Sequence, residues 1–358
     1  MSDNKHIIEV AQHFLTEGMI DFVEPYGDGH INSTYVATSD KKRYILQKMN
    51  TSLFTEPEKL MRNIRLVTDY LKKAVEEAGV DESVLEIIKT DDGRDLYEND
   101  GEAWRMYAFI EESICYQQVE STKDFYECAE AFGKFATYLD EFDASVLYEA
   151  IPNFHNTTNR LKNLEAAISA DVCGRVERVS REIEFYRTRK SYCTKITSLL
   201  DSGEMPNRVT HNDTKLNNIL FSRETGNPLA IIDLDTVMPG SVCYDFGDSI
   251  RYGCNTVAED EPDASKVDFS VELFEAFTKG YIKGFDKITK IERDNLLWGA
   301  MIITYECGMR FLTDYISGDT YFHTTRADQN LDRAHTQMRM VELMEEKFDE
   351  LERIVREA

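Results

Sequence analysis

The chain has 358 residues, and its 41 basic and 66 acidic side chains give a formal net charge of −25. A length of this order suggests about two domains. A composition of 42% hydrophobic and 30% charged residues is typical of a soluble globular protein with a sizeable core. So acidic a surface repels the phosphates of nucleic acids and of anionic lipids, and we therefore expect neither as a partner.

The cysteines and the apolar runs indicate in which cellular compartment the protein is expected. Seven cysteines are scattered along the chain without a CxxC pair, which argues against a disulfide framework or structural zinc. The apolar runs fall short of the roughly 20 residues that a membrane helix needs. The N-terminal residues mix acidic with apolar positions, unlike a signal peptide. We expect a cytoplasmic protein without a membrane partner, and the sequence indicates no obligate protein partner.

The first 110 residues predict a small antiparallel β-rich lobe with one long helix. An amphipathic helix is expected over residues 4–17. The long helix is expected over residues 56–78, because apolar residues recur there at helical spacing and Pro57 is tolerated in a first turn. The strand-like segments are residues 22–39, where a Gly-rich turn separates two strands, and residues 41–49, 84–90 and 104–110.

Residues 111–358 predict a larger, mainly helical lobe that is interrupted once. Residues 208–240 contain two short apolar strands around a Gly-Asn-Pro turn, which predicts a β-hairpin. A β-rich lobe, a helical lobe and one hairpin near their junction is the layout of a two-lobed kinase. We therefore predict an α+β, bilobal, protein-kinase-like fold, with a nucleotide-binding lobe at 1–110 and a catalytic and substrate-binding lobe at 111–358.

The segment around this hairpin carries the pattern with the clearest chemistry. His211 begins an H-x-D-x-x-x-x-N spacing, in which Asp213 is followed by Asn218, and Asp233 ends the second strand. This spacing matches the kinase catalytic loop. Phosphoryl transfer needs a carboxylate that accepts the proton of the attacking hydroxyl, and an amide oxygen and a second carboxylate that hold magnesium. Asn and Asp are also common in turns, but the hairpin and the upstream strands favour the catalytic interpretation.

A second acidic motif lies beyond the hairpin. Asp245-Phe246-Gly247 spells the metal-binding tripeptide of protein kinases, yet Asp233 is the acid that the second strand delivers directly. We therefore assign the metal to Asp233, with Asp235 as an additional candidate. Asp245 is expected to brace the catalytic loop through backbone N–H groups, and His211 to hold the loop.

The candidate nucleotide contacts lie in the first lobe. Gly27, Asp28 and Gly29 occupy the place of a phosphate-covering loop, where glycine lets the backbone approach an anion. The same tripeptide is also an ordinary hairpin turn. Gln47 falls where protein kinases carry a phosphate-pairing lysine. Lys48 is adjacent, but strand alternation points it to the other face. The group that replaces the lysine is left open.

The last strand of the first lobe leads into the expected hinge. Kinase hinges bind adenine through backbone groups. We place this hinge at Phe109, Ile110 and Glu111, which follow the apolar strand segment WRMYA.

These segments together resemble the aminoglycoside phosphotransferase-like kinases, a family that includes choline, homoserine and methylthioribose kinases. HNDTKLNNIL combined with IIDLDT is specific for the broad family. GDGHIN combined with ECGMRF is similar to the N-acetylhexosamine 1-kinases in particular. The likeness runs nearly end to end, and the glutamine at position 47 is shared within that subgroup.

The resemblance implies ATP- and Mg²⁺-dependent phosphorylation of the anomeric C1 hydroxyl of N-acetylhexosamines (GlcNAc or GalNAc), with the sugar 1-phosphate as product. It makes Asp213 the catalytic base in contact with the sugar, and Asn218 and Asp233 the magnesium ligands.

The resemblance also suggests three further sugar contacts, His30, Arg310 and Tyr321. Arg310 has an alternative structural role, because Asp314 lies four residues further along a predicted helix and could pair with it. An aromatic residue such as Tyr321 is more often a core residue than a stacking platform.

Two other functions stay open. One is a kinase of another small hydroxyl compound of the aminoglycoside, choline or homoserine type, since cationic substrates favour acidic pockets and the charge of −25 permits one. The other is a catalytically inactive, nucleotide-binding regulator, which the missing lysine at position 47 suggests. The intact set of Asp213, Asn218 and Asp233 argues against the regulator.

Overall fold

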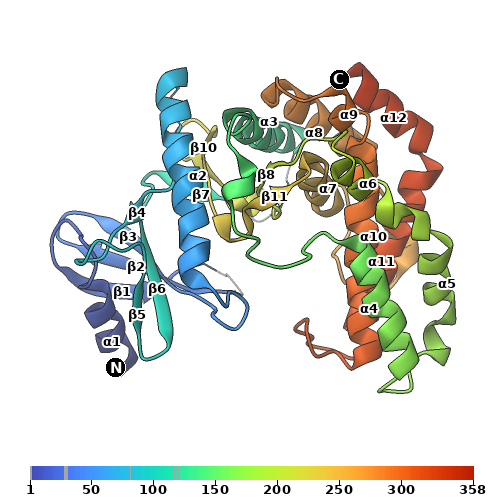
Figure 1. The fold of residues 1–358 in the computed structure, drawn as a ribbon, viewed down its shortest axis with the longest axis horizontal. Helices are drawn as coiled ribbons and strands as arrows, with labels where there is room; N and C mark the ends of the chain where they lie inside the picture. The colour runs from blue at the N-terminus through green and yellow to red at the C-terminus, as the bar shows by residue number, and fades with distance from the viewer. Residues whose placement is uncertain (1, 28–30, 81, 117, 120) are drawn as a thin grey trace. The chain divides into compact units, whose positions relative to one another are not determined.

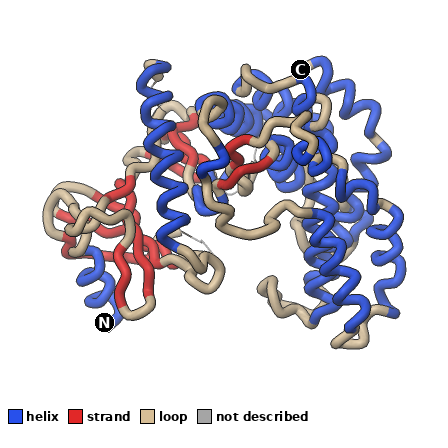
Figure 2. Tube along the Cα trace, viewed as in Figure 1, coloured by secondary structure: helices blue, strands red, loops and turns tan. Residues whose placement is uncertain are grey.

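The computed structural model describes residues 2–27, 31–80, 82–116, 118–119 and 121–358, and the chain forms two compact units. The first unit comprises Met1–Cys115, Ser145–Pro152 and Ile219–Met238, and the second comprises Tyr116–Ala144, Asn153–Asn218 and Pro239–Ala358. Most strands lie in the first unit and most helices in the second (Figure 1, Figure 2). This is the predicted α+β class. Every helix within the described residues is too short or too polar to cross a membrane.

The first unit is built on an antiparallel sheet. Its strand order is β1-β2-β3-β6-β4, and β5 pairs with β6. The strands are β1 (Ile20–Pro25), β2 (Ser33–Ser39), β3 (Arg43–Lys48), β4 (Ile87–Ile88), β5 (Tyr97–Asn99) and β6 (Glu102–Ala108). The predicted strands are confirmed. β5 was not predicted, because its sequence, YEN, has no apolar alternation. Helix α1 (Ser2–Ala11) packs against β1 and ends earlier than expected, since Phe14 bridges to Thr90 instead.

The long helix α2 (Pro57–Ala78) confirms the predicted range. Its apolar stripe is buried, and Gly79 ends it in the left-handed conformation at φ 65°. The fully buried Asn63 on this helix donates to the carbonyl oxygen of Tyr148 and accepts from the backbone N–H of the same residue. The Asn63 amide also donates to the carbonyl oxygen of Val237 at 3.2 Å. One buried amide therefore ties α2 to two chain segments that are distant in sequence.

The predicted hairpin is confirmed and belongs to the first unit. Strands β9 (Ile219–Ser222) and β10 (Pro228–Ile231) pair antiparallel, with Ile219 opposite Ile231. Strand β7 (Ser113–Cys115), which was not predicted, extends this sheet along β9. The pairing brings the end of β10, which leads into Asp233, back to the start of β9.

The second unit is helical, with α10 packed against α7, α11 and α4 (Figure 1). Its helices are α3 (Thr122–Tyr138), α4 (Thr157–Ala170), α5 (Ser180–Thr188), α6 (Thr197–Asp201), α7 (Val242–Gly253), α8 (Val271–Gly284), α9 (Lys290–Arg293), α10 (Leu296–Ser317), α11 (Gln329–Glu346) and α12 (Phe348–Glu357). The short strands β8 (Arg208–Thr210) and β11 (Met238–Gly240) flank the hairpin segment in sequence.

Helices α7 and α10 approach each other closely at two glycines. A Cβ on Gly299 would lie 2.0 Å from the carbonyl oxygen of Cys243, and a Cβ on Gly247 would lie 2.5 Å from the carbonyl oxygen of Gly299. Phe246, which directly precedes Gly247, is fully buried against Phe277 and Tyr281. The tripeptide Asp245-Phe246-Gly247 is therefore part of a packed helix, and its glycine allows the close contact with α10.

We predict that Gly299→Ala lowers the stability of the protein. Alanine in a helix is favoured over glycine by about 1 kcal/mol, but overpacking against backbone costs about 1–3 kcal/mol or more. The carbonyl oxygen of Cys243 cannot move aside as a side chain can, so the clash should win. Thermal unfolding should show a reduced Tm for this variant and an unchanged Tm for Ser169→Ala on the exposed face of α4. A Tm for Gly299→Ala at or above that of the wild type would contradict the close approach.

Candidate active site

A buried carboxylate on α7 holds the catalytic loop. Asp245 accepts hydrogen bonds from the backbone N–H groups of His211 at 2.8 Å and Asn212 at 2.7 Å. Thr214, on the same loop, donates its hydroxyl to the carbonyl oxygen of Asp245. Burial raises the pKa of the Asp245 carboxyl to about 6, although His211 and the two N–H groups act in the opposite direction and lower it. The predicted bracing role of Asp245 is confirmed.

His211 is a structural residue, as predicted. Its side chain is fully buried and meets the rings of Phe132 and Phe135 edge-on. Its Nδ1 atom accepts a hydrogen bond from the backbone N–H of Asp213 at 3.3 Å. The imidazole thus fixes the peptide that carries the next functional side chain.

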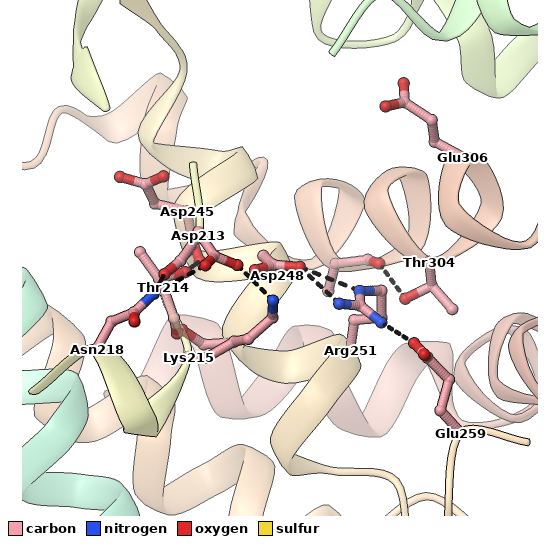
Figure 3. Close-up of polar contacts among 12 residues, drawn as sticks. Asp213, Thr214, Lys215, Asn218, Asp245, Asp248, Arg251, Glu259, Thr304 and Glu306 are labelled. Carbon is pink, nitrogen blue, oxygen red and sulfur yellow. Dashed lines mark hydrogen bonds and ion pairs between the residues drawn. The ribbon is translucent and has the colours of Figure 1, made fainter. Parts of the chain in front are cut away.

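The Asp213 carboxylate is held from two sides. The amide nitrogen of Asn218 donates to Asp213 Oδ2 at 2.8 Å and to the Asp213 carbonyl oxygen at 2.7 Å. The Lys215 ammonium lies 2.6 Å from Asp213 Oδ1 (Figure 3). The predicted base and the predicted amide ligand are therefore in direct contact. Our sequence analysis missed Lys215, although the D-x-K spacing in HNDTK could have indicated it.

Lys215 belongs to a longer chain of charges in the second unit (Figure 3). Burial lowers the pKa of Lys215, but the carboxylates of Asp213 and Asp248 outweigh it and hold that pKa above its ordinary value. Asp248 in turn accepts two hydrogen bonds from Arg251, which also pairs with Glu259. A charged ammonium group therefore lies beside the Asp213 carboxylate.

The predicted metal ligands have the chemistry that magnesium prefers. The amide nitrogen of Asn218 is engaged by Asp213, so its amide oxygen is the group that can face a cation. Asp233 is exposed, and it adopts a left-handed conformation at φ 59° before a short helical turn, η5 (Leu234–Thr236). Magnesium takes one or two carboxylates and completes its shell with phosphates and water. Each of the two residues therefore carries an oxygen of the kind that such an ion takes.

Gln47 is part of a hydrogen-bonded network in the first unit. Its amide nitrogen donates to the Thr34 hydroxyl at 3.0 Å, and its amide oxygen accepts from Arg105 Nε at 2.9 Å. Arg105 lies directly opposite Gln47 in the pairing of β3 with β6. Lys48 points to the other face, as predicted, where it pairs with Glu102 and lies over the Trp104 ring.

Asp235 is not positioned as a second metal ligand. Arg105 binds both of its carboxylate oxygens, and the Asn32 amide donates to Oδ2 at 2.7 Å. Arg105 and Asp235 are only 1% and 4% exposed. The sequence analysis missed Arg105, since an arginine in a strand carries no local signal of burial.

The expected hinge follows β6. The backbone N–H of Phe109 donates to the carbonyl oxygen of Arg43 at 3.2 Å, and the Arg43 guanidinium lies 4.1 Å from the Phe109 ring centroid and pairs with Glu111. Ile110 is half-buried between them in sequence. Gly27 adopts φ 71° at the start of the Gly-rich turn. Asp28, Gly29 and His30 lie outside the described residues.

The alternative pairing of Arg310 is wrong. Asp314 instead accepts hydrogen bonds from three backbone N–H groups, those of Thr320, Tyr321 and Phe322, and from the Asn330 amide. The Arg310 guanidinium lies 5.3 Å and 6.0 Å from the ring centroids of Phe322 and Tyr321. Tyr321 is 66% exposed, so the alternative of a core residue is also wrong. Arg310 and Tyr321 are therefore adjacent, and neither is explained by packing.

The sequence analysis missed Glu306, which lies one turn before Arg310, its partners Thr157 and His155, and Arg160. Glu306, on α10, is buried; it accepts from the Thr157 hydroxyl at 2.6 Å, and its carboxylate lies 3.3 Å from His155 Nδ1. Burial and the nearby charge of Arg310 lower the pKa of Arg160, on α4. These polar groups come from helices that are distant in sequence, so no local motif marks them.

Solved structures of similar fold cover nearly the whole chain. A microcompartment-associated aminopropanol kinase matches with a TM-score of 0.58 at 13% identity, over 97% of this chain and 98% of that one. A spectinomycin phosphotransferase, solved with ADP and spectinomycin, matches at 0.54 and 13%, over 94% and 97%. A choline kinase from Cryptosporidium parvum Iowa II matches at 0.57 and 13%, over 97% and 96%. These likenesses confirm the predicted protein-kinase-like fold.

The sequence itself identifies the family. Residues 23–280, well over half of the chain, match the APH phosphotransferase enzyme family. The matched range includes the catalytic loop with Asp213 and Asn218, the hairpin and α7. The chain therefore belongs to the APH phosphotransferase enzyme family.

Proposed function

We propose that the protein is an ATP- and Mg²⁺-dependent kinase that phosphorylates the anomeric C1 hydroxyl of N-acetylhexosamines. The observation that carries the proposal of a working kinase is the Asp213 carboxylate, held between Asn218 and Lys215 on a braced loop. An inactive regulator would have no need of such a carboxylate. The hexosamine as acceptor rests on the resemblance of GDGHIN and ECGMRF to the N-acetylhexosamine 1-kinases.

In the proposed reaction Asp213 orients the acceptor hydroxyl and takes its proton as the oxygen attacks the γ-phosphorus. The bond from that phosphorus to the β–γ bridging oxygen breaks, and ADP leaves. Magnesium, when bound, neutralises the phosphate charge that develops. Asn218 and Asp233 are the residues that would hold it. Lys215 supplies a positive charge beside the base, which favours a phosphate oxygen there. An anomeric hydroxyl is more acidic than an ordinary alcohol, which suits a weak carboxylate base.

ATP as phosphate donor has support from a structural relative. The spectinomycin phosphotransferase of similar fold is solved with ADP. In this chain we assign adenine to the backbone of Phe109, Ile110 and Glu111, and the phosphates to the Gly-rich turn that Gly27 begins.

The side chains around Arg310 favour an uncharged, oxygen-rich acceptor. Arg310 and Arg160 bring two positive charges close together on α10 and α4, and arginine N–H groups bind hydroxyl or carbonyl oxygens. The exposed Tyr321 ring offers an apolar face, as sugar rings require. A cationic acceptor would be repelled by both guanidinium groups.

A second candidate is a kinase of cationic amino alcohols or aminoglycosides. The observation in its favour is that carboxylates lie in the same unit, among them Asp248 and Glu306. Each is already engaged, Asp248 by Arg251 and Glu306 by Thr157 and His155. The hypothesis of a hexosamine acceptor therefore accounts for the charges near Arg310 better than that of a cationic acceptor.

The first prediction from this function concerns the base. Asp213→Asn should lower kcat by about 10²–10⁴, the usual contribution of general base catalysis, while Tm and ADP binding stay near the wild-type values. Asp294→Asn, an exposed carboxylate at the end of α9, is the matched control and should keep full activity. A near-normal kcat in Asp213→Asn would contradict the assignment of Asp213 as the base.

The second prediction concerns the acceptor atom. N-acetylglucosamine or N-acetylgalactosamine should yield a 1-phosphate, identified by ³¹P and ¹³C NMR, and the matching methyl glycosides should be inert because the attacking oxygen is blocked. ATP consumption with choline, homoserine and an aminoglycoside should be at background level. A 6-phosphate, or turnover of the methyl glycoside, would refute the C1 reaction. Turnover of choline alone would select the second candidate.

The third prediction separates sugar binding from nucleotide binding. Arg310→Ala should raise the KM for the sugar roughly tenfold or more, since a hydrogen bond from a charged donor contributes about 1.5–3 kcal/mol. The KM for ATP should stay unchanged. Arg339→Ala, which removes an arginine from the surface of α11, should alter neither constant. An equal rise of both constants in Arg310→Ala would indicate a general structural defect.

A further inference from the structure

The first unit contains one buried cation at the position where a kinase of this fold would present its lysine. Arg105 lies on β6 directly opposite Gln47 of β3. Directly opposed residues of antiparallel strands share a face of the sheet, and Arg105 Nε donates to the Gln47 amide oxygen at 2.9 Å. The positive charge that position 47 of β3 lacks is thus present at Arg105 on the neighbouring strand.

This cation is committed to one carboxylate. Both terminal nitrogens of Arg105 donate to the two oxygens of Asp235, a fork that fits a carboxylate closely. Burial lowers the pKa of Arg105, but the neighbouring Asp235 carboxylate outweighs it, and the net shift is upward. Because both groups are almost fully buried, the loss of either leaves an uncompensated charge in the interior.

The pair controls a turn that carries a second carboxylate. Asp235 is part of η5, which packs against α2, and Asp233 immediately precedes this turn. Asp233 is exposed while Asp235 is buried. The Asn32 amide, which also accepts from the backbone N–H of Asn50, holds Asp235 from another side. The two acids of the segment DLD therefore point to different environments.

We propose that Arg105, which lies opposite the position of the missing lysine, is a positioning residue: by holding Asp235 inward, it turns Asp233 outward as the carboxylate that binds magnesium. This inference rests on the proposed function, which gives Asp233 its metal role. Arg105 acts through Asp235 and does not bind the phosphates, because its guanidinium is 1% exposed and its three nitrogen atoms are each engaged, by Gln47 and by Asp235.

The test is a double-mutant cycle on the pair. Arg105→Gln, Asp235→Asn and the double variant R105Q/D235N are compared with the wild-type protein by thermal unfolding and by calorimetric titration with ADP at graded Mg²⁺ concentrations. Lys48→Gln is the matched control, since Lys48 lies on the same strands, next to Gln47, and makes its ion pair on the opposite face. Arg105→Lys keeps the positive charge but loses the two-nitrogen contact with Asp235, and it replaces Arg105→Gln in the test if that variant does not fold.

Both single variants should raise the Mg²⁺ concentration needed for half-maximal ADP binding about 10- to 100-fold, the usual effect of removing a group that orients a metal ligand. Arg105→Lys should lie between them and the wild type. The double variant should bind better than either single one, because no unpaired charge remains buried. Lys48→Gln should behave as the wild type.

Two results would overturn the proposal. A lower Tm in the single variants with an unchanged Mg²⁺ requirement would make the pair purely structural. A double variant with a recovered Tm that keeps the full ADP-binding defect of Arg105→Gln would make Arg105 a direct nucleotide ligand. Neither readout depends on the acceptor, so a failure of the hexosamine assignment leaves this test intact. If the wild-type protein itself showed no Mg²⁺-dependent ADP binding, the proposed function would be refuted.

Discussion

The buried carboxylate of Asp245 is the interaction on which the geometry of the catalytic loop depends. Two successive backbone N–H groups of that loop, at His211 and Asn212, point at one side chain. Asn212 has a positive φ of 64°, a left-handed conformation that asparagine adopts more readily than most other non-glycine residues. Helix α7 carries Asp245 and is itself fixed against α10 at Gly247 and Gly299. The position of the loop thus depends on the contact between α7 and α10.

Cations in both units are paired one by one with carboxylates. Arg105 pairs with Asp235 in the first unit, and Lys215 pairs with Asp213 in the second. The Arg105–Asp235 pair is buried, so breaking it leaves a charge that the interior cannot solvate, whereas Lys215 and Asp213 are both partly exposed. In a chain with a net charge of −25, cations placed in this way supply positive charge locally, at single carboxylates.

The same arrangement distinguishes aspartates that look alike in the sequence. Asp233, Asp235 and Asp245 all lie near a kinase-like motif. The structure gives them different surroundings: Asp233 is exposed, Asp235 is clamped by Arg105, and Asp245 accepts backbone N–H groups. The chemistry available to a carboxylate follows from its surroundings, and these three aspartates have different ones.

Local patterns in the sequence were sufficient for most of the elements and for placing His211, Asp213 and Asn218 together in one loop. The helical spacing before Gly79, the strand alternation around Gln47 and the Gly-Asn-Pro hairpin are near-neighbour signals, and all three elements are present. The order His211, Asp213, Asn218 likewise predicted side chains that are in contact, because they lie within one short loop. The bracing role of Asp245 followed from its place after the hairpin.

Only the tertiary structure decided the contacts that join distant segments. The Arg105–Asp235 pair spans 130 residues, and its formation depends on the register of β3 with β6 and on the packing of η5. Arg310 loses its expected partner because the chain after α10 folds back to give Asp314 three backbone N–H groups. A sequence states which groups are present and how closely they follow one another. Packing between elements determines which donor reaches which acceptor, and it gives carboxylates that look alike in the sequence different surroundings.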